Sequence, residues 1–172
     1  MICPHTPWLS KPLCCRYVFA GFKTLRLPVR VGDVVTDATW RWALGLFRQD
    51  EYEVLGAWPP QSTHEQVARD LHARGVERIV AVHGRTDCRS SFPGAVIWPP
   101  AVAPEEAGST AALHPFGRRR RAVLQSAVAT AAQIQSRIAR AIKRRAPFSD
   151  EAAAAAFLTE MLQKADRRFF NA

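Results

Sequence analysis

The succession of hydrophobic patterns between residues 34 and 82 is the feature that most constrains the fold of this chain. Three short runs rich in β-branched and aromatic residues predict strands: Val34–Thr39, Trp42–Phe47 and Tyr52–Trp58. A hairpin turn is expected at 49–51, and the prolines at 59–60 end the third strand because proline cannot donate to a sheet ladder. The three strands should therefore form an antiparallel meander.

A helix and a further strand follow the meander. Residues 62–65, Ser-Thr-His-Glu, have the pattern of a capping box, in which the Ser62 hydroxyl accepts a hydrogen bond from the Glu65 amide. Gly75 suits the end of this helix, and Val76–Val82 is typical of a buried strand. A meander, a helix and a strand predict an α/β fold with a mixed sheet.

Two helices are expected near the C-terminus. Apolar residues recur at steps of three and four from Leu124 to Ile142, which predicts one long helix that Pro147 ends. Ser149 is the expected N-cap of a last helix that contains the alanine run 152–156. The chain should therefore end in a helical hairpin.

The chain divides into four predicted segments within a length that suits a single domain. They are an irregular N-terminal segment at 1–30, the α/β core at 31–98, a linker rich in proline, alanine and glycine at 99–117, and a basic helical region at 118–172. No run approaches the roughly 20 apolar residues that span a bilayer, and the N-terminus lacks the apolar core of a secretory signal. We expect a cytoplasmic protein with no membrane partner.

The net charge of +9 is concentrated in one segment, Arg118–Arg145. This segment has nine basic residues and no acidic one, whereas the other 15 basic residues balance the 15 acidic residues. The nine are Arg118, Arg119, Arg120, Arg121, Arg137, Arg140, Lys143, Arg144 and Arg145. Such a helix suits the phosphates of DNA, although a merely solvated helix face is the alternative.

Several carboxylates could bind divalent metal ions. Asp37 interrupts the apolar residues of the first predicted strand, and Asp87 follows the strand Val76–Val82. Glu160 on the last helix is the first choice for a third carboxylate, and Glu151 is the second. Together they could hold Mg²⁺ (or Mn²⁺) for phosphoryl transfer, with Asp37 and Asp87 as the metal ligands, but each could also be an ordinary solvated side chain.

Histidines and cysteines give weaker indications. His64 and His83 could act as acids or bases, but lone histidines are more often structural. Cys3, His5, Cys14 and Cys15 are suitable zinc ligands without the CxxC spacing of a zinc knuckle. Together with Cys88, the cysteines are expected to be free thiols.

Several motifs between residues 34 and 95 resemble the catalytic core of Mutator-type insertion-sequence transposases. They are Val-Val-Thr-Asp-Ala-Thr-Trp at 34–40, Glu-Tyr-Glu-Val-Leu-Gly-Ala-Trp at 51–58, Ala-Arg-Asp-Leu-His-Ala-Arg-Gly-Val-Glu-Arg-Ile at 68–79 and Phe-Pro-Gly-Ala at 92–95. That family has a ribonuclease H-like fold with an Asp-Asp-Glu triad that binds magnesium, and it cuts and joins DNA ends. The resemblance implies a ribonuclease H-like mixed sheet and identifies Asp37 as the first triad residue.

The match covers about a third of the chain and departs from the family at several places. Arg85 stands where the family has its second aspartate, and Val96–Pro99 replaces its Cys and His motif. Residues 1–30 match nothing, which suggests a truncated or degenerate transposase.

Three hypotheses about function follow. The first is a DDE-type transposase, with Asp37, Asp87 and Glu160 as the catalytic residues. The second is a non-catalytic nucleic-acid-binding module that uses the basic helix. The third is an interaction protein that offers the apolar stripe Leu124–Ile142 to a partner, with self-association into a homo-oligomer as its test.

Overall fold

The computed structural model describes residues 8–48, 50–84, 91–98 and 116–170, without the side chains of 167–170. Its first three strands form an antiparallel meander: β1 (Arg16–Val31), β2 (Val34–Arg48) and β3 (Glu51–Trp58). Gly32 (φ 62°) allows the tight turn between β1 and β2, and Asp50 (φ 60°) lies in the turn before β3. An antiparallel meander is therefore present, but its predicted strands are partly wrong: the runs 34–39 and 42–47 form the single strand β2, and the first strand of the meander is β1.

The prediction of an irregular segment over residues 1–30 is wrong from Arg16 onward. β1 lies at the centre of the sheet, antiparallel to β2 and parallel to β4 (Arg78–His83). β5 (Val96–Ile97) pairs in parallel with β4, so the order of strands is β3-β2-β1-β4-β5. The fold is α/β with a mixed five-stranded sheet.

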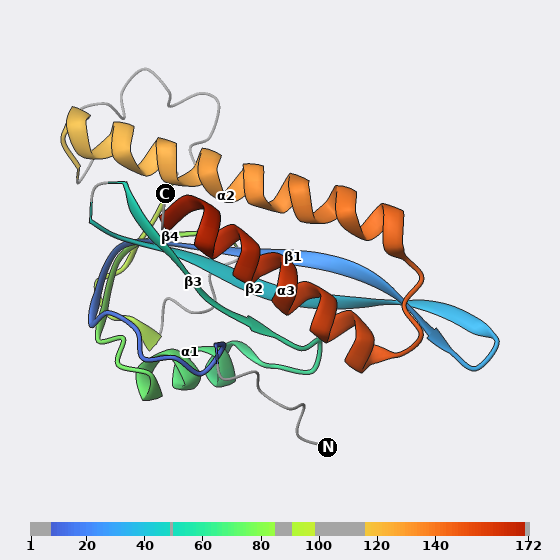
Figure 1. Cartoon of the computed structure of the whole chain (residues 1–172). Helices are drawn as coiled ribbons and strands as arrows, with labels where there is room; N and C mark the ends of the chain where they lie inside the picture. The colour runs from blue at the N-terminus through green and yellow to red at the C-terminus, as the bar shows by residue number, and fades with distance from the viewer. Residues whose placement is uncertain (1–7, 49, 85–90, 99–115, 171–172) are drawn as a thin grey trace, which may run out of the picture.

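Helices cover both faces of this sheet (Figure 1). α1 (His64–Ala73) lies on one face, and α2 (Arg118–Arg145) and α3 (Glu151–Phe170) form the predicted hairpin on the other face. Each face has its own hydrophobic core, because neighbouring strand residues point to opposite sides. Phe19, for example, packs in the core under α2 and α3, whereas Ala20 packs in the core over α1.

The apolar stripe of α2 is buried against the chain's own sheet. Its buried residues are Leu124, Ala127, Ala131, Ile134, Ile138 and Ile142. Trp42 Nε1 donates a hydrogen bond of 2.7 Å to Gln135 Oε1, which fixes the helix above β2. The hypothesis that this stripe serves as a partner surface is therefore wrong, because the sheet already covers it.

Both predicted N-caps are displaced by one residue. Thr63, not Ser62, caps α1: its hydroxyl accepts from Gln66 N at 3.2 Å, and the Gln66 side chain accepts from Thr63 N at 2.8 Å. In α3, the Asp150 carboxylate accepts from Ala153 N at 2.7 Å, so Asp150 has the capping role predicted for Ser149. Neighbouring residues of similar capping ability make this position ambiguous from sequence.

The distal part of the β1–β2 hairpin extends beyond the strands on either side of it (Figure 1). β3 ends opposite Arg41, and β4 ends opposite Gly21. Arg30 N and Phe148 O form a hydrogen bond of 2.9 Å, which attaches the hairpin to the connection between α2 and α3. Asp37 lies in this distal part, paired with Pro28.

Candidate nucleic-acid interface

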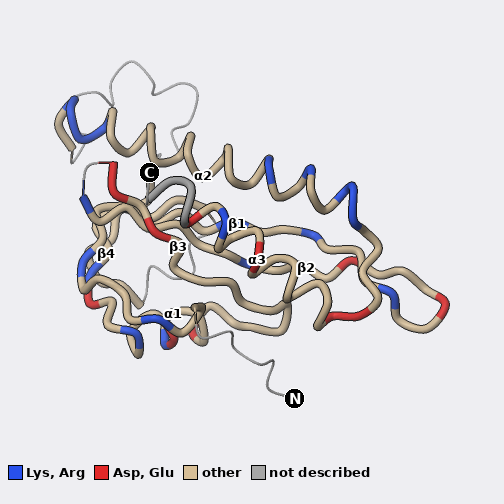
Figure 2. The backbone as a smooth tube through the Cα atoms, in the orientation of Figure 1, with Lys and Arg blue, Asp and Glu red and all other residues tan. Residues whose placement is uncertain are grey.

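The basic residues of α2 form two clusters at the ends of the helix (Figure 2). The N-terminal cluster is Arg118–Arg121, and the C-terminal cluster is Arg137, Arg140, Lys143, Arg144 and Arg145. Arg121 is partly buried and the other eight are exposed. At a rise of 1.5 Å per residue, the uncharged segment 122–136 separates the clusters by roughly 24 Å.

Arg137, Arg140 and Arg144 lie opposite the buried isoleucines, as the spacing predicted. Ile138 and Ile142, which alternate with them along the helix, are buried, whereas the three arginines are exposed. A helical period of 3.6 residues produces this division into two faces. The cations therefore face outward from the sheet.

The stability of the helix does not explain the N-terminal cluster. Cations near a helix N-terminus oppose the macrodipole, whereas the three at the C-terminus, Lys143–Arg145, are favoured by it. The first turn of α2 has no acidic residue, and Gly117 provides no side-chain cap. A bound polyanion would relieve the repulsion among Arg118–Arg121 and accept hydrogen bonds from the helix N-terminus.

Pairing with acids does not account for most of these cations either. Arg118–Arg121, Arg140 and Lys143–Arg145 form no salt bridge with another described residue. Two of them stack on aromatic rings: Arg120 lies 5.6 Å from the centroid of Phe116, and Arg145 lies 5.9 Å from that of Phe157. Arg140 Nε donates to Ser136 O at 3.3 Å. These contacts orient the guanidinium groups and leave their charge available.

The N-terminal cluster also borders a recess of about 560 Å³. Arg48, at the end of β2, joins Arg118, Arg119 and Arg120 around it. Val18, Leu46 and Val123 supply apolar lining. Sequence reasoning missed Arg48, because its approach to α2 depends on the packing of the helix across the sheet.

The candidate catalytic carboxylates that the structure describes lie on separate elements of the fold. Asp37 is exposed on the distal hairpin, and Glu160 is exposed on α3, where a hydrogen bond from Lys164 lowers the pKa of its carboxyl group. Glu151, in the first turn of α3, accepts a hydrogen bond of 3.3 Å from Gln61. Asp87 lies outside the described residues. Within the described ranges, no three His, Cys, Asp or Glu side chains are grouped so that they could hold a metal ion.

A lysine and a histidine lie where the parallel pairing of β1 with β4 ends, Lys23 two residues beyond the last paired residue of β1 and His83 at the end of β4. Lys23 Nζ lies 3.5 Å from His83 Nε2, and His83 Nδ1 lies 2.8 Å from the Trp98 carbonyl oxygen. Because that carbonyl can only accept, Nδ1 carries the proton and Nε2 accepts from Lys23. Burial lowers the pKa of His83, and Lys23 lowers it further. Both ring nitrogens of His83 are thus hydrogen-bonded in its neutral form.

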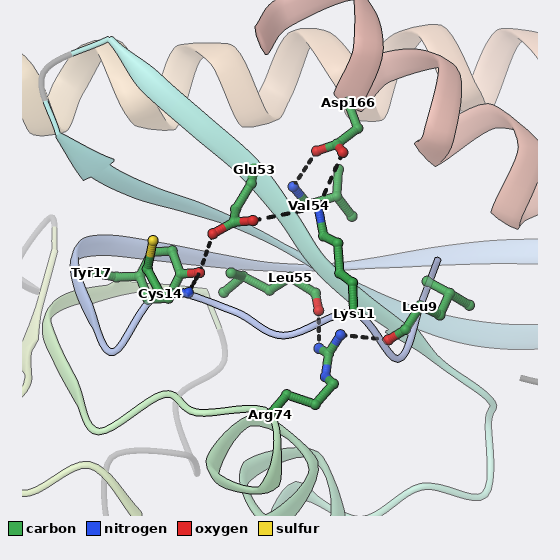
Figure 3. Close-up of polar contacts among 9 residues, drawn as sticks. All are labelled: Leu9, Lys11, Cys14, Tyr17, Glu53, Val54, Leu55, Arg74 and Asp166. Carbon is green, nitrogen blue, oxygen red and sulfur yellow. Dashed lines mark hydrogen bonds and ion pairs between the residues drawn. The ribbon is translucent and has the colours of Figure 1, made fainter. Parts of the chain in front are cut away.

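Two carboxylates converge at a different place, where they bind Lys11 (Figure 3). Lys11 Nζ lies 3.4 Å from Glu53 and 3.2 Å from Asp166, and Asp166 also accepts from Val54 N at 2.8 Å. Tyr17 donates to Glu53, and burial together with this bond raises the pKa of Tyr17 above its usual range. The cluster joins the N-terminal segment to β3 and α3, and we interpret it as structural.

The described cysteines do not indicate a zinc site. Cys14 and Cys15 are exposed free thiols, whereas Cys3, His5 and Cys88 lie outside the described residues. Burial raises the pKa of the Cys14 thiol, and the nearby Glu53 raises it further.

In comparisons with known proteins, no family model matches the chain and no curated protein sequence matches it. None of the helices in the described part of the chain has both the length and the apolar character needed to cross a lipid bilayer.

Proposed function

We propose that this protein is a nucleic-acid-binding module that binds DNA through the outer face of α2 and does not cleave it. We propose the cytoplasm as its location. The observation that carries the proposal is the acid-free helix with cations at both ends, eight of which are exposed. Each phosphate neutralised by such a cation releases condensed counterions. Binding of this kind is electrostatic and largely independent of base sequence.

We further propose that the sheet is ribonuclease H-like and that it descends from a Mutator-type transposase. The strand order β3-β2-β1-β4-β5, with an antiparallel meander followed by a helix and a parallel strand, supports this origin. The central strand β1 has no acidic residue, and Lys23 and His83 lie where its parallel pairing with β4 ends. Because β1 offers no carboxylate to bind a metal ion, this arrangement favours DNA binding without strand transfer.

Binding is tested by fluorescence anisotropy with a labelled DNA duplex between about 0.05 and 0.2 M salt. The logarithm of the association constant should fall linearly with the logarithm of salt concentration, by roughly 0.9 per phosphate contact. In the variant Arg140→Gln/Arg144→Gln, the slope should become shallower by about 2.

The matched control is Arg69→Gln, an exposed residue of α1 on the opposite face of the sheet. This variant should bind as the wild type does. Binding that is insensitive to salt, or equal losses in both variants, would contradict the proposed interface.

Cleavage is tested separately with supercoiled and linear DNA in the presence of Mg²⁺ or Mn²⁺. If Mg²⁺ were bound for strand transfer, Asp37 would be a ligand, and Asp37→Asn would abolish cleavage. We expect no metal-dependent nicking by the wild type and unchanged DNA affinity in Asp37→Asn. Nicking that disappears in this variant would show that the protein is an enzyme.

A further inference from the structure

The recess beside the N-terminal cluster brings together four arginines from two elements. Arg118, Arg119 and Arg120 come from the first turn of α2, and Arg48 comes from the end of β2. The described lining residues include no acid, and Glu51, the register partner of Arg48, is exposed outside the lining. Four like charges around one recess repel each other, so an anion bound among them would be stabilised.

The recess also has an apolar part. Leu46 is buried, and Val18 and Val123 are partly buried beside it. The volume of about 560 Å³ falls within the range of small-molecule sites. A ligand that combines a compact anionic group with a less polar group matches both parts, and a nucleotide, with its phosphate and its base, has this composition.

We propose that this recess binds the terminal nucleotide of a nucleic-acid strand, with its terminal phosphate among the arginines and its base against the apolar residues. This inference rests on the proposed function. An internal phosphodiester carries one negative charge, whereas a terminal phosphomonoester carries about 1.5 to 2 near neutral pH. Arginine binds such a group through two parallel N–H donors, so the recess favours a phosphorylated end over the interior of a strand.

Three labelled oligonucleotides of one sequence test the proposal: one with a 5′-phosphate, one with a 3′-phosphate and one with hydroxyl groups at both ends. One phosphorylated end should bind about tenfold more tightly than the hydroxyl form, and which one does so gives the polarity of the strand. A free mononucleotide should compete with that end, because it has the same phosphate and base.

Two arginine variants separate the recess from the rest of the interface. In Arg48→Gln, the preference for the phosphorylated end should disappear. In Arg140→Gln, at the other end of α2, the affinities for all three oligonucleotides should fall by a similar factor and the preference should remain. Thermal unfolding of each variant establishes that it is folded.

The outcomes distinguish this inference from the proposed function. If the three oligonucleotides bind equally well to the wild type, the recess inference is wrong while the nucleic-acid interface stands. If Arg48→Gln retains the preference, the phosphate binds elsewhere and the recess inference is also wrong. If no oligonucleotide binds, both proposals fail.

Discussion

At the scale of single residues, Lys11 connects distant parts of the chain. Its ammonium group lies between the carboxylates of Glu53 and Asp166, and its side chain is only 27% exposed. Removal of the ammonium group leaves two nearby carboxylates without their shared cation. Lys11→Met should therefore lower the free energy of unfolding by roughly 1–2 kcal/mol, as measured by urea denaturation.

Lys164→Met is the control for this prediction. Lys164 is also paired with a carboxylate, that of Glu160, but its side chain is 66% exposed. Exposed pairs of this kind contribute little, so this variant should unfold at nearly the wild-type urea concentration. Equal losses in the two variants would show that the Lys11 cluster has no special structural role.

His83 should make the stability of the protein depend on pH in a defined direction. Burial lowers its pKa in the folded state below the usual value of 6.5, and Lys23 adds to this effect. Below about pH 6.5 the unfolded chain therefore binds a proton that the folded chain does not. The contribution of His83 to stability is complete above that pH and is lost as the pH falls toward the lowered pKa.

The variant His83→Gln tests this pH dependence. Its unfolding free energy should decline less steeply between about pH 6.5 and 5 than that of the wild type. Lys23→Met should flatten the decline only slightly, because burial is the larger cause of the lowered pKa. A wild-type slope that is retained in His83→Gln would refute the assignment.

At the scale of elements, the first turn of α1 offers a test of one hydrogen-bond pattern. Thr63 and Gln66 form a reciprocal capping box, whereas Ser62 precedes it. Thr63→Ala should therefore lower the stability by about 1 kcal/mol, and Ser62→Ala should have a much smaller effect. Thermal denaturation monitored by circular dichroism measures both, and the reverse order would favour the cap expected from the sequence.

At the scale of the whole molecule, a polyanion should stabilise the fold. The positive excess lies on the face of the molecule formed by α2, where most cations have no acidic partner among the described residues. A ligand that binds only the folded state stabilises it by about 2.7 kcal/mol at 100 times its dissociation constant. For a domain of this size, that corresponds to a rise in melting temperature of roughly 5–10 °C.

Inorganic polyphosphate is a suitable probe, with melting followed by scanning calorimetry. The rise should be smaller for Arg140→Gln/Arg144→Gln than for Arg69→Gln, in which the same type of residue is changed on the opposite face. A melting temperature that polyphosphate leaves unchanged would indicate that the cations do not form a common binding surface.

The sequence by itself determined α2, the division of that helix into a buried and a charged face, and the hairpin that it forms with α3. It also determined β3 and the helix after it, but it divided β2 into two strands. These features depend on hydrogen bonds four residues apart, on periodic spacing and on local turn chemistry, all of which can be seen within short windows.

Only the tertiary structure decided that β1 is the central strand, because a strand is completed by partners far away in the sequence: β4 begins some sixty residues after the start of β1. For the same reason it alone placed Asp37 on an exposed hairpin, Lys23 beside His83, and Arg48 beside the first turn of α2. The charge of α2 is a property of its local sequence. The residues of the sheet that lie beside it, such as Arg48, depend on how the helix packs across the strands.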